Sequence, residues 1–143
     1  MQVDRRQATE SDIPFLLALR RETMDGHLAA SGADCSEQAH LARVMHHFDC
    51  AEVLTHEGSP VGLLKLRREA EAWEIVQIQL GHRLQGHGIG RALLEEVLAD
   101  AAIAGVEVRL SVLKANPARR LYERLGFRTV GEDAHEYFMR RAA

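Results

Sequence analysis

The stretch Gln85-Gly86-His87-Gly88-Ile89-Gly90-Arg91-Ala92-Leu93-Leu94 places three glycines within five residues, directly before a strong helical pattern. Glycines at alternate positions permit backbone conformations closed to other residues, and they let the main chain approach a ligand without a Cβ in the way. A helix that starts here has N–H groups without intrahelical partners, and the positive end of its dipole faces the loop. The stretch is therefore predicted to be an anion-binding loop.

The spacing of the glycines separates this loop from two nucleotide-binding motifs. A Walker loop requires a lysine and then serine or threonine after its last glycine, whereas Arg91 and Ala92 follow Gly90. A dinucleotide fingerprint requires GxGxxG, and Arg91 stands where the third glycine would fall. Neither motif fits well, and a tight strand-to-helix turn without a ligand is the simplest alternative.

The pattern that does fit is [Gln/Arg]-x-x-Gly-x-[Gly/Ala], formed by Gln85, Gly88 and Gly90. Here the sequence resembles the GNAT superfamily of acetyl-CoA-dependent N-acetyltransferases, in which this loop holds the pyrophosphate of coenzyme A. A second segment, from Asn116 to Phe127, resembles the asparagine, helix, tyrosine and "GF" segment of the same family. With two independent motifs at the right separation, the chain is identified as a member of that superfamily.

The composition predicts a single domain over residues 1–143, without a nucleic-acid or membrane partner. The formal charge is -3 at pH 7, whereas nucleic-acid-binding domains usually carry a basic surplus. No apolar run has the length of a membrane span or of a signal-peptide core, so a cytoplasmic location is expected. Cys35 and Cys50 lack the spacing of a disulfide or metal framework and are predicted to be free thiols.

The eight histidines do not predict a metal site. His46 and His47 are adjacent, and the others are scattered without a framework of carboxylates or thiols. The sequence contains neither an HExxH motif nor paired CxxC motifs. No metal is therefore expected.

Two helices are predicted after a short edge strand over residues 2–8. Thr9-Glu10-Ser11-Asp12 is typical of a helix N-terminus, and the apolar period after it predicts a helix to about Met24. Its polar face is expected to hold Arg20, Arg21 and Glu22. A small-residue break over Gly26–Gly32 leads to the second helix, from Ser36 to about Phe48. The buried face expected for that helix consists of Leu41, Val44, Met45 and Phe48.

Strands dominate the rest of the predicted order. Three consecutive strands cover residues 51–56, 61–66 and 73–80, and they lead into the glycine loop and a helix over Ile89–Ala104 that Gly105 closes. A right-handed crossover sets the next strand, over 107–113, parallel to 73–80. A short helix from Pro117 to Leu125 and a hairpin of 127–131 with 135–139 complete the chain.

This order matches the GNAT fold over essentially the whole chain. The resemblance implies an α+β, mixed α/β domain with a central, mostly antiparallel sheet of roughly six to seven strands and about four flanking helices. One parallel pair of strands is expected to splay apart. The helix-loop-helix at the start looks like a lid or a substrate-side insertion.

The resemblance also implies where acetyl-CoA binds. The pantetheine arm would lie between the splayed strands and pair with main-chain groups of residues 78–80, where an N–H would also polarise the thioester oxygen. Backbone N–H groups of residues 86–91 would hold the pyrophosphate, and Asn116 would contact the arm or cap the helix after it. The expected binding residues are Ile78, Gln79, Leu80, Gln85, Gly86, His87, Gly88, Ile89, Gly90, Arg91 and Asn116.

Tyr122 is the first candidate for a chemical role. Cleavage of the thioester releases a thiolate, and a phenol can donate a proton to it. A buried tyrosine that packs the terminal helix is the structural alternative. The base that deprotonates the amine is expected to be a carboxylate or a water, and Glu74 and Glu22 are the candidate carboxylates, with His27 behind them.

The sequence thus predicts an N-acetyltransferase that transfers acetyl from acetyl-CoA to a primary amine by direct attack in a ternary complex. The acceptor is expected to be a small amine, or alternatively a peptide amine. A closed pocket formed by residues 22–36 would favour the small amine, and an open acidic groove the peptide. The alternative from another class is a non-catalytic sensor or interaction module that binds acyl-CoA. Exposed strands near the C-terminus make a homodimer plausible.

Overall fold

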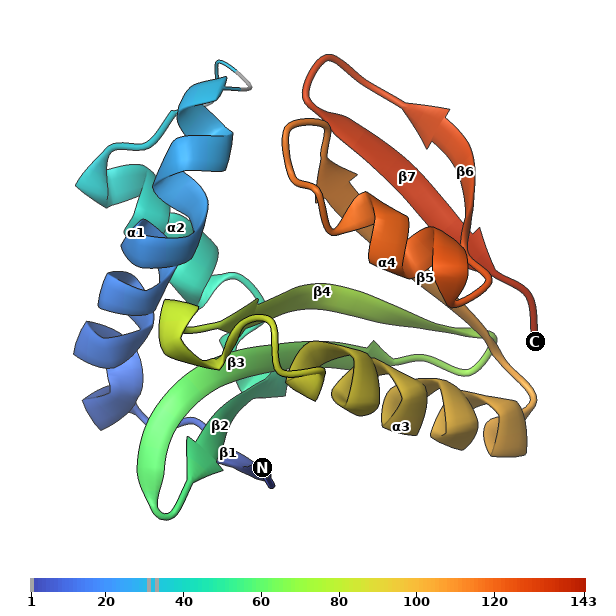
Figure 1. The fold of residues 1–143 in the computed structure, drawn as a ribbon, viewed down its shortest axis with the longest axis horizontal. Coiled ribbons are helices and arrows are strands. Elements are labelled where there is room, and N and C mark those ends of the chain that lie inside the picture. Colours follow the sequence, from blue (N-terminus) through green and yellow to red (C-terminus); the bar gives the residue numbers. More distant parts are fainter. Residues whose placement is uncertain (1, 31, 33) are drawn as a thin grey trace.

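Seven strands form one mixed sheet in the computed structural model, which describes residues 2–30, 32 and 34–143. The strand order is β1-β2-β3-β4-β5-β7-β6 (Figure 1). The strands are β1 (Asp4–Gln7), β2 (Ala51–His56), β3 (Ser59–Arg68), β4 (Ala72–Leu80), β5 (Glu107–Leu113), β6 (Arg128–Glu132) and β7 (Glu136–Arg141). Among these strands β4 and β5 pair in parallel, and all other neighbours are antiparallel. The fold class predicted from the sequence is thereby confirmed.

Four helices lie against this sheet in the described ranges. They are α1 (Ile13–Ala30), α2 (Glu37–Met45), α3 (Ile89–Ala104) and α4 (Arg119–Arg124), with 3-10 turns η1 (Glu10–Asp12), η2 (Phe48–Cys50) and η3 (His82–Leu84). Figure 1 shows α1 and α2 together at one side of the molecule and α3 running along the sheet. None of the helices in this part of the chain is long and apolar enough to cross a bilayer.

The hydrophobic core has two parts, one on each face of the sheet. The larger part joins α3 to the centre of the sheet and includes Leu64, Ile75, Leu94, Val97 and Val108, all at most 3% exposed. The smaller part joins α1 and α2 to β2 and β3 and includes Leu16, Leu19, Val44, Val53 and Leu63. The alternation of side chains along each strand supplies both faces.

β4 and β5 are paired over only the first part of their length. Their register joins Ala72–Ile75 to Glu107–Leu110, and no pairing between them follows in the described residues. On its other edge β4 stays paired with β3, with an irregularity between Lys65 and Leu66 that leaves Val76 without a partner. In Figure 1 the far end of β4 continues toward α1, while β5 and β7 turn away from it. The splayed pair is therefore confirmed.

α1 is longer than the sequence predicted. The helix was expected to end near Met24, but it continues through Gly26 to Ala30. A glycine inside a helix costs about 1 kcal/mol relative to alanine, whereas burial of a leucine contributes about 1.5–3 kcal/mol. Leu28, in the extra turn, is 6% exposed. Its burial outweighs the glycine, and the predicted break at Gly26 is wrong.

α2 begins as predicted, but its end and its buried face differ from the prediction. Ser36 is the N-cap, with its Oγ accepting from the Ala39 N–H at 3.2 Å. The buried residues of the helix are His40 and Val44, whereas Leu41 and Met45 are 43% and 45% exposed. The helix ends at Met45 rather than Phe48, and His47 then adopts a left-handed conformation with φ 52°.

A buried lysine from β3 explains this early end. Lys65 is 0% exposed, and its Nζ donates to the carbonyl oxygens of Arg43, Val44 and His46 at 2.8, 2.8 and 2.6 Å. These are carbonyls that the end of a helix leaves without intrahelical donors. A cation is also favourable at a helix C-terminus. Lys65 therefore caps α2 and ties it to the sheet.

The second half of the chain agrees with the prediction more closely. α3 and β5 have the predicted bounds. Glycines in the left-handed region stand on both sides of α3, Gly88 with φ 75° and Gly105 with φ 72°. The predicted terminal hairpin is present as β6 and β7, and β7 is inserted between β5 and β6.

Candidate functional site

The glycine loop joins the end of β4 to the start of α3. Gly86 and Gly88 have φ 82° and 75°, a conformation that glycine adopts without the steric cost of a side chain. The first hydrogen bond of α3 runs from the Ala92 N–H to the Gly88 carbonyl at 3.0 Å. The N–H groups of residues 89–91 precede it and have no intrahelical acceptor. The start of α3 therefore offers backbone donors suited to an anion.

A cavity of about 580 Å³, called here the loop cavity, lies beside these donors. Its lining includes the predicted binding residues Ile78, Gln79, Leu80, Gln85, Gly86, Gly88, Ile89, Gly90, Arg91 and Asn116. His87 was predicted with them but is not on the lining. Gln85 also holds the loop in place, because its Nε2 donates to the carbonyl oxygen of Leu80 at 2.9 Å.

A second cavity, of about 430 Å³, is lined by α1, α2 and the separated ends of β4 and β5 and is called the α1/α2 cavity. Its volume lies in the range of small-molecule sites. From the segment 22–36 it takes Met24, Leu28 and Asp34. The charged residues on its lining are Arg20, Asp34, Arg43 and Glu136. The helix-loop-helix thus forms one wall of a cavity, and its role as a substrate-side insertion stays a prediction.

The two cavities meet in the opening between β4 and β5. Five residues line both of them: Met24, Ile78, Gln79, Asn116 and Tyr122. These five residues therefore border both cavities. The structure brings Tyr122 and Asn116, from the second sequence motif, to the same place as β4 and the glycine loop.

Tyr122 is buried at this junction, with 7% of its surface exposed. Its ring packs edge-to-face on Phe127, with 5.9 Å between the ring centroids. Burial raises the pKa of Tyr122 to about 12, so the phenol keeps its proton at neutral pH. Asn116 caps the turn before α4, because its Oδ1 accepts from the Ala118 N–H at 2.9 Å. That leaves the amide nitrogen of Asn116 as the group available to a ligand.

The two carboxylates considered as bases lie outside both cavity linings. Glu22 is exposed, and its Oε2 accepts from the His82 N–H at 2.8 Å, just beyond the end of β4. Glu74 lies in the paired part of β4, and its Oε1 accepts from Arg67 Nη1 at 3.0 Å. The side chain of His27 is outside what the structure describes.

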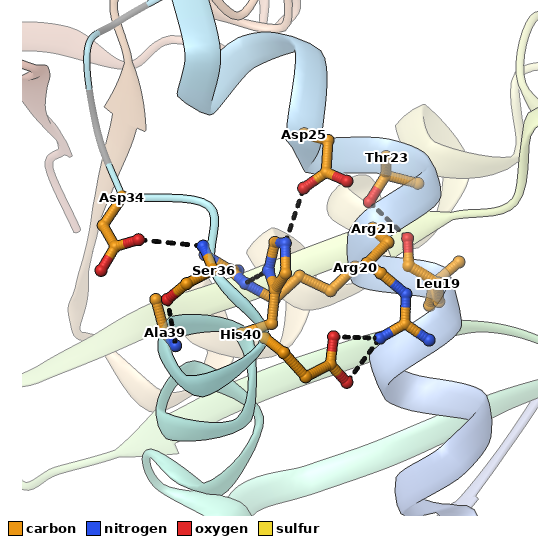
Figure 2. A network of polar contacts seen from close by, with 10 residues as sticks. Leu19, Arg20, Arg21, Thr23, Asp25, Asp34, Ser36, Ala39 and His40 are labelled. Carbon is orange, nitrogen blue, oxygen red and sulfur yellow. Dashed lines mark hydrogen bonds and ion pairs between the residues drawn. The ribbon is translucent and has the colours of Figure 1, made fainter.

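Arg20 is a cavity residue that the sequence prediction misplaced. It was expected on the polar face of α1 but is 6% exposed and lines the α1/α2 cavity. Its Nε donates to Nδ1 of His40 at 3.1 Å, and Nε2 of His40 lies 2.6 Å from Oδ1 of Asp25 (Figure 2). The helical period holds a signal for this placement, since Arg20 is four residues from both Leu16 and Met24, which point inward.

Three cations influence one another around the C-terminal end of α2. The pKa of Arg20 is lowered to about 10 by burial and by the charge of Arg43, against the attraction of Asp25. Burial, Arg43 and Arg20 together lower the pKa of Lys65 to about 8. This end of the α1/α2 cavity therefore has a positive potential that hydrophobic patterning does not reveal.

No group of three or more histidine, cysteine, aspartate or glutamate side chains suited to a metal ion occurs among the described residues. Cys35 is an exposed free thiol, and Cys50 is a half-buried free thiol. Neither cysteine lines the two cavities.

Comparison with protein families gives a match to the acetyltransferase (GNAT) domain over residues 22–140. Human N-acetylaspartate synthetase is 28% identical over 112 residues, which is 71% of this chain and 37% of that protein. The chain therefore spans little more than a third of that relative's length.

Solved structures of similar fold cover the whole chain. An acetyltransferase from Thermus thermophilus has a TM-score of 0.78 at 23% identity, with 100% of this chain and 98% of that one aligned. The PaiA N-acetyltransferase from Thermoplasma acidophilum, in complex with coenzyme A, has a TM-score of 0.77 at 18% identity, with 100% of both chains aligned. At these identities the likeness establishes the fold.

Proposed function

The chain belongs to the GNAT acetyltransferase family, and we propose on this premise that it transfers acetyl from acetyl-CoA to a primary amine. Transfer proceeds by direct attack in a ternary complex. The main support for this proposal is that Tyr122 and Asn116 line both cavities. A donor in the loop cavity and an acceptor in the α1/α2 cavity would react at that junction.

The loop cavity supplies the groups that a coenzyme A pyrophosphate requires. The free N–H groups at the start of α3 would bind its oxygens, and Gly86 and Gly88 let the main chain approach them. Beyond Ile75 the edge of β4 that faces β5 is unpaired in the described residues. The pantetheine arm would add to this edge like a strand.

Chemistry at the junction requires two proton movements. The amine loses a proton and attacks the thioester carbonyl, the carbon–sulfur bond breaks, and the thiolate takes up a proton. A thiol has an ordinary pKa near 8.5, well below the value of about 12 for Tyr122. Complete transfer from the phenol is therefore uphill, and a hydrogen bond from Tyr122 to the developing thiolate is its most direct contribution.

The amine must be neutral before it attacks, because an aliphatic ammonium with a pKa near 10.4 has no free electron pair. Glu22 and Glu74 are retained as candidate bases, together with a water in the junction. Their distance from the cavity linings favours the water. A backbone N–H of residues 78–80 would stabilise the oxyanion of the tetrahedral intermediate.

The acceptor is proposed to be a small amine, because the α1/α2 cavity of about 430 Å³ is of small-molecule size. Amino acids belong in any test, since the human relative is named N-acetylaspartate synthetase. The competing proposal is a module that binds acyl-CoA without turnover. The buried phenol at the junction favours the enzyme.

Release of coenzyme A from acetyl-CoA, measured over a panel of amines, amino acids, polyamines and peptides, tests this proposal. A thermal-shift measurement with acetyl-CoA accompanies it. Stabilisation by acetyl-CoA together with release of coenzyme A supports the enzyme. Stabilisation by acetyl-CoA without release of coenzyme A in the presence of any amine supports the sensor. Absence of stabilisation contradicts both.

A further inference from the structure

Two arginines line the α1/α2 cavity without an ion-pair partner among the described residues. Neither Arg20 nor Arg43 takes part in any of the salt bridges formed within those ranges. The neighbouring Arg21 differs from them, since its Nη1 contacts both oxygens of Glu37 at 2.7 and 2.6 Å on the protein surface. Arg20 and Arg43 therefore lack the kind of ion pair that holds the adjacent Arg21.

Arg20 is fixed by a directed chain of hydrogen bonds. An arginine has donors but no acceptor, so Nδ1 of His40 must accept from Arg20 Nε, and the proton of His40 stands on Nε2. That proton is donated to Oδ1 of Asp25, as Figure 2 shows. Of the donor nitrogens of Arg20, only Nε takes part in this series of hydrogen bonds. The two Nη groups have no acceptor in the described part of the molecule and stay available to the cavity.

Gln77 adds an unpartnered donor to the same lining. Its side chain is 9% exposed, and its Nε2 has no hydrogen-bond partner among the described residues. Gln77 pairs with Lys65 across β3 and β4, so both side chains stand on the face of the sheet that α2 covers. A buried amide without a partner is costly, and an acceptor oxygen in the cavity would satisfy it.

The acidic residues of the cavity stand on different elements from this cationic end. Asp34 belongs to the connection between α1 and α2, and Glu136 is the first residue of β7. In Figure 1 the chain directly before α2 and the start of β7 lie at the same end of the molecule. Asp34 is also engaged, because its Oδ1 accepts from the Ser36 N–H at 2.9 Å. Asp25 attracts Arg20 only through space and through His40, so neither cavity arginine is in direct contact with a carboxylate of the described residues.

We propose that Arg20, Arg43 and Gln77 bind a carboxylate of the acceptor, so that the acetylated amine belongs to an amino acid. A planar carboxylate suits the forked donors of arginine. This inference rests on the proposed acetyl transfer and adds the class of the acceptor. An amine of the same shape without the negative charge is a poor acceptor.

The test compares each L-amino acid with its α-carboxamide, and aspartate and glutamate also with asparagine and glutamine, in the coenzyme A release assay. The α-carboxamide keeps the shape of the acceptor and removes the charge. Wild-type protein is expected to show a kcat/KM for the best acid that exceeds that of its amide by about tenfold to a hundredfold, the range for a hydrogen bond to a charged group. Equal values for the acid and its amide overturn the proposal.

Variants then assign the preference to the arginines. Arg43→Gln, at an exposed position, is expected to raise KM for the acid about tenfold and to change the kinetics of the amide much less. Arg20→Lys keeps the charge but loses the fork and is expected to reduce the preference as well. Arg21→Gln is the matched control, and it should retain the wild-type preference. If Arg20→Lys does not fold, Arg43→Gln decides the question alone.

Binding of acetyl-CoA is measured by thermal shift in every variant. This measurement separates a failure of the carboxylate site from a failure of the proposed acetyl transfer. Stabilisation by acetyl-CoA with equal turnover of polyamines and amino acids leaves acetyl transfer intact and overturns the carboxylate site. A preference for acids that survives in both arginine variants overturns it too. No stabilisation and no release means that the proposed function itself has failed.

Discussion

The side-chain amide of Gln85 donates to the carbonyl oxygen of Leu80 at 2.9 Å, so the first residue of the glycine loop is fastened to the last residue of β4. The loop is thus anchored to the strand that forms one wall of the junction. A change in loop conformation would be transmitted to both cavities, because Leu80 lies on the loop cavity and neighbouring Gln79 on both.

The glycines of the loop are expected to differ in their tolerance of alanine. Gly88 has φ 75°, and Gly90 lies within α3. Gly88→Ala should lower the free energy of unfolding by about 1–2 kcal/mol, because a side chain in the left-handed region is strained. Gly90→Ala should leave it unchanged or raise it by up to about 1 kcal/mol, since the new Cβ would lie 3.5 Å from Leu80 Cδ1. Urea denaturation of the two variants measures this difference. Equal destabilisation would contradict the interpretation that, of these two glycines, Gly88 alone needs the left-handed conformation.

Tyr122→Phe is expected to reduce kcat by about a hundredfold, the lower range for loss of one hydrogen-bond donor to a developing negative charge. The affinity for acetyl-CoA should change little, because the phenol acts on a thiolate that forms only during the reaction. Steady-state kinetics and a binding titration measure the two quantities separately. Full turnover in Tyr122→Phe would leave the residue with a packing role against Phe127.

Glu22→Gln and Glu74→Gln are expected to leave the pH dependence of kcat/KM unaltered. Glu22 is engaged with the His82 N–H and Glu74 with Arg67, away from the cavity linings. The measurement is a pH profile of each variant beside that of the wild type. Loss of the limb on which the base titrates, in either variant, would identify that carboxylate as the base.

Lys65→Met is expected to lower the free energy of unfolding by about 3 kcal/mol or more, because the carbonyl oxygens at the end of α2 lose their shared donor. Lys114→Met is the matched control. Lys114 forms a surface pair with Glu132 at 3.2 Å, and such pairs contribute at most about 1 kcal/mol. Chemical denaturation of both variants gives the comparison. Equal effects would mean that Lys65 does not stabilise the end of α2.

Asp12 is expected to make the stability depend on pH in the acid range. Arg6 donates to both of its oxygens at 2.8 and 2.9 Å, and together with the Thr9 N–H it lowers the pKa of Asp12 from 3.8 to about 2. The folded state therefore keeps Asp12 charged at a pH where the unfolded chain protonates it. The resulting stabilisation is present above about pH 4 and is lost as the pH falls toward 2.

The size of this stabilisation follows from the lowered pKa of Asp12, and it is reduced because Arg6 is half exposed. It is about 1–2 kcal/mol at neutral pH. Asp12→Asn should lose this amount at pH 7, and its deficit against the wild type should shrink as the pH approaches 2. A deficit that is constant between pH 5 and pH 2 would show that the ion pair is not its source.

Local sequence signals are sufficient to predict the helix and strand that follow the glycine loop. Glycines in the left-handed region mark both ends of α3, and they were visible in the sequence as Gly88 and Gly105. The alternation of Glu107–Leu113 likewise fixed β5 and its face. These features depend on neighbours in the sequence, so a single sequence is enough to predict them.

The α1/α2 cavity depended on contacts between distant residues and was predicted poorly. The end of α2 is set by Lys65, about twenty residues later in the chain, and no local pattern announces it. The composition of α1 predicts a solvent-exposed Arg20, because an arginine is rarely buried, although Arg20 stands at helical spacing from the inward-facing Leu16 and Met24. Gln77 and Gln79 were part of the alternation that predicted a strand, but the sequence did not show that their face borders a cavity.

The burial of Lys65 also protects the chain against chemical modification. The sequence contains two lysines, Lys65 and Lys114, and thioesters acylate neutral amines without a catalyst. With a pKa of about 8, the amine of Lys65 would be neutral more often at neutral pH than that of an ordinary lysine, if a reagent reached it. It is 0% exposed and engaged with the carbonyls at the end of α2. The fold therefore hides this amine from an acyl donor, whereas Lys114 is exposed.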